Sequence, residues 1–102
     1  MCYTLNSEAI EQFGQHLKQE EKSGATIEKY LRDIRHFYVF LEGRPLFKAE
    51  TVAYKEQLTE QYAPASVNSM LVALNGFLRF IGRTDCCVRL LKIQRQIFCR
   101  EE

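Results

Sequence analysis

Residues that could bind a metal or act as a nucleophile are few and widely spaced in this 102-residue chain. The two histidines, His16 and His36, are far apart, and no two cysteines have the C-x-x-C spacing of a zinc site. The sequence has no Gly-rich phosphate loop, no H-E-x-x-H helix and no G-x-S-x-G turn. We therefore expect no catalytic centre, metal or cofactor. We expect free thiols at Cys2, Cys86, Cys87 and Cys99.

Basic residues carry the chemistry that the sequence does suggest. The net charge is only +1, but the charges are unevenly placed. Residues 79–100 hold six basic residues and one acidic residue, whereas residues 1–78 hold eight basic and ten acidic residues. A basic segment on a near-neutral body suits a partner that carries phosphates, and a solvated C-terminal helix would have the same composition.

Two stretches of the chain combine an apolar helical stripe with a polar or basic outer face. In residues 24–41 this outer face carries Lys29, Arg32, Arg35 and His36. In residues 64–81 the corresponding positions are Ser66, Ser69, Gly76 and Arg79. A helix of this kind can enter the major groove of DNA, where Lys and Arg reach phosphates or guanine edges and Ser or Thr contact either. The alternative is a face that is only solvated, as most charged helix faces are.

Helices must position these faces, because apolar residues recur every three or four positions and no strand alternation is present. Gly and Pro separate the periodic segments. The pattern predicts helices over about residues 7–22, 23–41, 49–62 and 64–81, followed by a short helix from Asp85 through Leu90 and Leu91. The predicted fold is all-α, a compact orthogonal bundle of four to five helices.

Capping residues and apolar stripes support these boundaries. Asn6 or Ser7 can cap the first helix, Ser23 can cap the second, and Pro64 suits the first turn of the fourth. The expected buried positions in the four helices are Ile10, Phe13 and Leu17; Ile27, Tyr30, Leu31, Ile34, Phe37, Tyr38 and Leu41; Val52, Leu58 and Tyr62; and Val67, Leu71, Leu74, Phe77, Leu78 and Ile81. Beyond them, Ile93 and Ile97 could pack on the bundle or on another domain.

Two segments resemble the N-terminal core-binding domain of tyrosine recombinases, also called the SAM-like domain of phage-type integrases. In SGATIEKYLRDIRHFYVFL, residues 23–41, the positions that match the family are Ser23, Thr26, Tyr30, Asp33, Ile34, Phe37 and Leu41. In PASVNSMLVALNGFLRFIG, residues 64–82, they are Ser66, Val67, Asn68, Leu71, Leu74, Phe77, Phe80 and Gly82. The tail, VRLLKIQRQIFCREE, looks like the interdomain linker of integrases from mobile elements.

The resemblance implies a SAM-like domain over residues 1–84 and a basic C-terminal helix or linker over residues 85–102. A catalytic domain, absent from this chain, would follow the linker and would supply the nucleophilic tyrosine. The resemblance also implies binding to double-stranded DNA as half of a C-shaped clamp, beside other recombinase subunits, during DNA integration or recombination. The residues that we expect to contact DNA are Thr26, Lys29, Arg32, Arg35, Ser66, Ser69, Arg79 and Lys92.

The second segment departs from the family at several outer positions. Family members often have Arg or Lys where this chain has Ser69, Ala73, Asn75 and Gly76. We therefore expect the fourth helix to make few contacts with base edges.

A helical adaptor that binds another protein is the alternative function, since similar bundles serve both roles. Such an adaptor would expose an apolar patch. No segment has the length of a membrane span, and the N-terminus lacks the pattern of a signal peptide. We therefore expect a cytoplasmic protein without a membrane partner, and a fragment that is monomeric on its own.

Overall fold

Four α-helices and one 3₁₀ turn form the regular structure of residues 3–92, the part of the chain that the computed structural model describes. The helices are α1 (Ser7–Gln19), α2 (Gly24–Leu41), α3 (Lys48–Gln61) and α4 (Pro64–Phe80), and the turn is η1 (Thr84–Cys86). No strand occurs in this range. The predicted all-α bundle is confirmed, with its four main helices at the predicted places.

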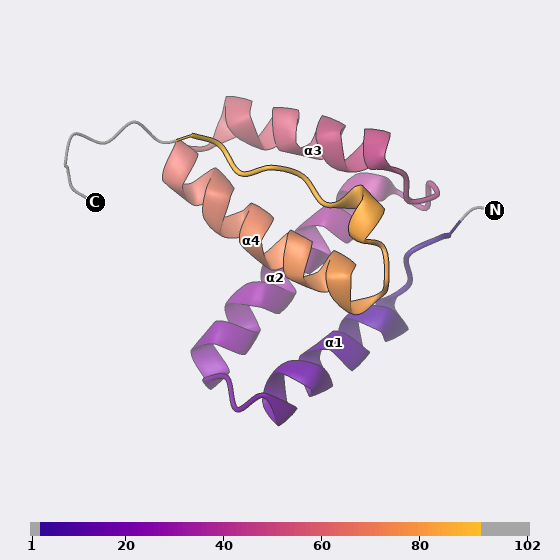
Figure 1. The fold of residues 1–102 in the computed structure, drawn as a ribbon, viewed down its shortest axis with the longest axis vertical. Coiled ribbons are helices and arrows are strands. Elements are labelled where there is room, and N and C mark those ends of the chain that lie inside the picture. The colour runs from indigo at the N-terminus through magenta and orange to yellow at the C-terminus, as the bar shows by residue number, and fades with distance from the viewer. Residues whose placement is uncertain (1–2, 93–102) are drawn as a thin grey trace.

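Helix α4 crosses α2, and this pair forms the centre of the bundle (Figure 1). Helices α1 and α3 lie on opposite sides of the pair, where each contacts both α2 and α4. The aromatic rings of Phe37 on α2 and Phe77 on α4 are fully buried between the helices. Within the described residues, no helix combines the length and apolar content needed to cross a membrane.

Local capping explains where α1 and α2 begin and where α1 ends. The side chain of Asn6 accepts a hydrogen bond from the Ala9 amide at 2.9 Å, and the side chain of Ser23 accepts one from the Thr26 amide at 3.2 Å. Helix α1 ends at Gln19, three residues before the predicted end. Glu21 takes a left-handed conformation (φ 62°), so the Lys22 amide turns back to the Leu17 carbonyl and closes the helix.

The predicted core is correct in α1, mostly correct in α2 and α4, and partly wrong in α3; in α2 the predicted Tyr38 is exposed. All three predicted α1 positions are buried, as are the central positions of α2 and α4. In α3, however, Val52 and Tyr62 are exposed, and Thr51 and Tyr54 are buried in their place. Thr51 tolerates burial because its hydroxyl donates to the Cys86 carbonyl at 2.7 Å.

The segment after η1 is not helical, so the predicted helix through Leu90 and Leu91 is wrong for the described residues. Residues 87–92, which we call the strap, run back along α4 and beside α3 (Figure 1). Val88 and Leu91 pack on the core, as they would also do on one side of a helix. The spacing of the apolar residues therefore did not distinguish the predicted helix from the observed strap. The predicted packing of Ile93 and Ile97 lies outside the described residues.

Candidate nucleic-acid interface

An open groove of about 350 Å³ separates the outer faces of α2 and α4. Four of the eight predicted DNA-contacting residues line it: Lys29 and Arg32 from α2, and Ser66 and Ser69 from α4. The remaining lining residues are Asp33, His36, Tyr62 and Met70. The groove thus brings basic side chains and hydroxyl groups together from two helices that are far apart in sequence.

Lys29 is engaged within the protein. Its ammonium group forms an ion pair with Asp33, one turn further along α2, and donates to the Ser69 carbonyl at 3.1 Å. Asp33 is buried, so its carboxylate needs this partner in place of water. Lys29 therefore ties α2 to α4 at the floor of the groove, and part of its charge is already neutralised.

Arg32 differs from Lys29 in both exposure and partners. Its side chain is exposed, and among residues 3–92 it has no ion pair or hydrogen bond. The guanidinium group can therefore offer all its donors to a ligand in the groove, and this planar fork matches the oxygens of a phosphate.

His36 and Tyr62 also line the groove but were not among the predicted contacts. The signal for His36 was present, because it follows Arg32 by four residues and therefore lies on the same helix face. Its Nδ1 atom lies 2.8 Å from the hydroxyl oxygen of Tyr54, a buried side chain of α3. This contact fixes the imidazole ring at the edge of the groove, and Nε2 is left as its second hydrogen-bonding atom.

Burial raises the pKa of the Tyr54 phenol above its usual value, and the nearby charges of Asp33 and Tyr62 raise it further. The folded protein therefore keeps Tyr54 protonated at a pH where the unfolded chain ionises it. Stability from this group is complete below the unfolded pKa of about 10 and is lost as the pH rises above it. The phenol can act as a hydrogen-bond donor toward His36 throughout the neutral range.

Replacing Tyr54 with Phe should make unfolding less sensitive to alkaline pH. Above about pH 10 the free energy of unfolding of the parent should fall more steeply than that of Tyr54→Phe, by up to about 1.4 kcal/mol per pH unit. Urea unfolding at a series of pH values measures both slopes. Tyr38→Phe, which removes an exposed tyrosine of α2, is the control. Equal slopes for the parent and Tyr54→Phe would contradict the prediction.

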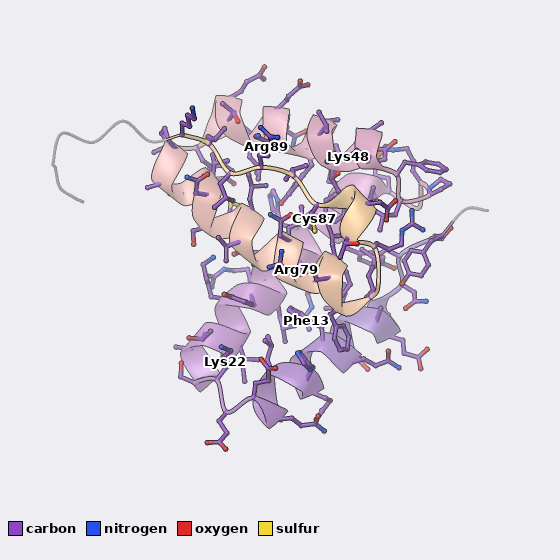
Figure 2. All side chains as sticks on the ribbon, viewed as in Figure 1. Phe13, Lys22, Lys48, Arg79, Cys87 and Arg89 are labelled. Atoms are coloured by element: carbon purple, nitrogen blue, oxygen red, sulfur yellow. The ribbon has the colours of Figure 1, made fainter. Side chains whose placement is uncertain are left out.

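The other four predicted contacts do not line the groove. Thr26 lies in the first turn of α2, where its hydroxyl accepts a hydrogen bond from Ser23. Arg35 lies beside α1, near Ile10 and Glu11. Arg79 lines a separate hollow between α1 and α4 (labelled in Figure 2), and Lys92 is exposed on the strap. The predicted set is therefore divided among several surfaces of the bundle.

Two of the departures from the family concern positions that are not on the surface. Ala73 and Asn75 are buried, and the amide of Asn75 binds the strap. The expectation that all four departures are at outer positions of α4 is therefore wrong for these two. Ser69 lines the groove and Gly76 is half-buried.

The cysteines that the structure describes are two free thiols, Cys86 and Cys87. Burial raises the pKa of the Cys86 thiol, which favours its protonated, poorly ligating form. Within residues 3–92, no group of three or more His, Cys, Asp or Glu side chains is arranged to hold a metal ion.

Comparison with known proteins places most of the chain in one family model. The model of the phage integrase N-terminal SAM-like domain matches residues 10–84. No curated protein and no solved structure matches the chain. The match includes α1 from Ile10 onward, the other three helices and the α2–α4 groove, and it ends before the strap.

Proposed function

The chain belongs to the family of phage integrase N-terminal SAM-like domains, and from this premise we propose that it binds double-stranded DNA through the α2–α4 groove. It would serve as the core-binding part of a tyrosine recombinase, holding DNA near the crossover site during integration or recombination. Strand cleavage and rejoining would come from a catalytic domain outside this chain. Other recombinase subunits would be its partners in the assembled complex.

The observation that carries this proposal is the groove itself. Arg32 on α2 is unpaired within the described residues, and Ser66 and Ser69 bring two hydroxyl groups to the same groove from α4. Such a set matches the backbone of DNA, where cationic and hydroxyl donors reach the phosphate oxygens. Helix α4 also begins without a side-chain cap, so the amides of its first turn remain available beside Ser66.

Binding to a short labelled duplex should weaken steeply as the salt concentration rises. Each phosphate contact contributes about −0.9 to the slope of log K against log salt. The groove cations alone would give a slope of about −2, whereas contacts from all five predicted cations would give about −4 to −5. Fluorescence anisotropy titrations at several salt concentrations measure this slope. Binding that does not change with salt would contradict a phosphate-binding groove.

A second candidate function is the adaptor role. A hollow of about 440 Å³ between α1 and α4 exposes the apolar side chains of Val72 and Phe80, which a protein partner could cover. The two roles are compatible, because the groove lies along the first half of α4 and the hollow along the second half. If no duplex bound even at low salt, the adaptor role would be favoured.

A further inference from the structure

Two asparagines of α4 hold the strap by its backbone. The side-chain amide of Asn75 donates to the Val88 carbonyl at 2.8 Å and accepts from the Val88 amide at 3.0 Å. Asn68 repeats this pattern with Leu91, with distances of 3.0 and 2.7 Å. Each asparagine thus satisfies both backbone groups of one strap residue, as a neighbouring strand would in a sheet.

The spacing of the two contacts fits a single register. Asn68 and Asn75 are two helical turns apart, so they lie on one face of α4 about 10.5 Å from each other. Three residues of extended chain, from Val88 to Leu91, also span about 10 Å. A shift of the strap by one residue would break all four hydrogen bonds and would remove the buried Val88 side chain from the core.

Helix α3 fixes the beginning of the same segment. The Thr51 hydroxyl donates to the Cys86 carbonyl at 2.7 Å, and the Lys48 ammonium group donates to the Cys87 carbonyl. In Figure 2, Cys87 on the strap lies between Lys48 on α3 and Arg79 on α4. The strap is therefore anchored on α3 first and on α4 afterwards.

The pairing also sets the direction in which the strap runs along α4. Val88 pairs with the later residue of α4 and Leu91 with the earlier one, so the strap runs antiparallel to α4 toward its N-terminal end (Figure 1). Lys92 follows Leu91 directly and so lies close to Asn68. This is the end of α4 at which Ser66 and Ser69 line the α2–α4 groove, although the asparagines and these serines lie on different sides of the helix.

We propose that Asn68 and Asn75 are positioning residues that clamp the strap in one register and hold Lys92 at the end of α4 where the groove lies, so that it can reach a duplex bound there. The DNA part of this inference rests on the proposed function, whereas the clamp does not. A tether without a fixed register would spread Lys92 over a wide volume. The clamp holds its charge at this end of α4, where it adds one phosphate contact to those of the groove.

Amide hydrogen exchange of the 102-residue chain tests the clamp without DNA. In Asn68→Ala, exchange of the Leu91 amide should accelerate by about ten-fold or more, because its acceptor is removed. Exchange of the Val88 amide should change much less. Asn68→Asp, which keeps an acceptor for the Leu91 amide, should preserve more of the protection and serves as a second variant if Asn68→Ala folds poorly.

Val72→Ala, an exposed change one turn away on α4, is the matched control and should leave the Leu91 amide protected. Rapid exchange of Leu91 in the parent, or equal exchange in the parent and Asn68→Ala, would overturn the clamp.

Duplex binding tests whether the clamp positions Lys92. Lys92→Glu should weaken binding by several-fold in the parent and by less than about two-fold in the Asn68→Ala background, because an unclamped Lys92 is no longer held at the N-terminal end of α4. Equal effects of Lys92→Glu in the two backgrounds would overturn the positioning role. Loss of duplex binding in every variant and in the parent would overturn the proposed DNA function, and the amide exchange would still decide whether the clamp exists.

Discussion

Reversing the charge of Arg32 is expected to weaken binding of this domain to a short DNA duplex by about ten-fold or more. Arg32 is the exposed cation of the α2–α4 groove, and it has no ion-pair partner within residues 3–92. In Arg32→Glu a donor to phosphate is replaced by a carboxylate that repels it. The slope of log K against log salt should also become smaller by about one. Anisotropy titrations at two salt concentrations measure both effects.

Arg35→Glu is the matched control for this experiment. Arg35 lies on the same helix, and its reversal changes the net charge by the same amount, but its side chain lies beside α1 outside the groove. We expect Arg35→Glu to weaken binding much less than Arg32→Glu. Equal losses in the two variants would mean that net charge, and not the groove, determines affinity.

Lys29 is a poorer choice for the same test. Its ammonium group pairs with the buried carboxylate of Asp33 and bridges to Ser69. A glutamate at this position would face Asp33 and leave a buried charge uncompensated, which destabilises the fold itself. A loss of binding in Lys29→Glu would therefore combine a change of contact with a change of structure, whereas Arg32→Glu separates the two.

Replacing Phe37 with Ala should cost about 3–5 kcal/mol of the free energy of unfolding. Phe37 is fully buried on α2, and its ring packs edge-on against Tyr54 of α3 with the ring centroids 4.9 Å apart. The variant leaves a cavity where α2 meets the rest of the bundle. The melting temperature should fall by on the order of 20 °C, since each kcal/mol lowers it by about 4–8 °C in a domain of this size. Thermal and urea unfolding followed by circular dichroism measure these values.

Val39→Ala, two residues further along α2, provides the comparison. Val39 is 69% exposed, so its truncation should change the free energy of unfolding by no more than about 0.5 kcal/mol. A cost for Val39→Ala close to that for Phe37→Ala would show that the assigned inner and outer faces of α2 are wrong. The same faces determine which side chains reach the groove, so this stability comparison also tests how the groove is built.

The sequence by itself determined the helices and most of their buried stripes. Apolar spacing and capping are local properties, so the Ser23 cap and the Pro64 start could be predicted without knowing the packing. The same local geometry placed Lys29, Arg32 and His36 on one face of α2. Helix α3 was harder to predict, because the hydroxyl groups of the buried Thr51 and Tyr54 have partners in distant parts of the chain, Cys86 and His36.

Only the tertiary structure decided which outer residues meet. A helical period gives the direction of a side chain relative to its own axis, but not which helix stands beside it. For this reason Arg35 lies against α1 while Arg32 faces α4, although both lie on the predicted outer face of α2. The strap shows the same limit, since an amide such as that of Asn75 looks like a surface residue until the backbone of Val88 is brought to it by the fold.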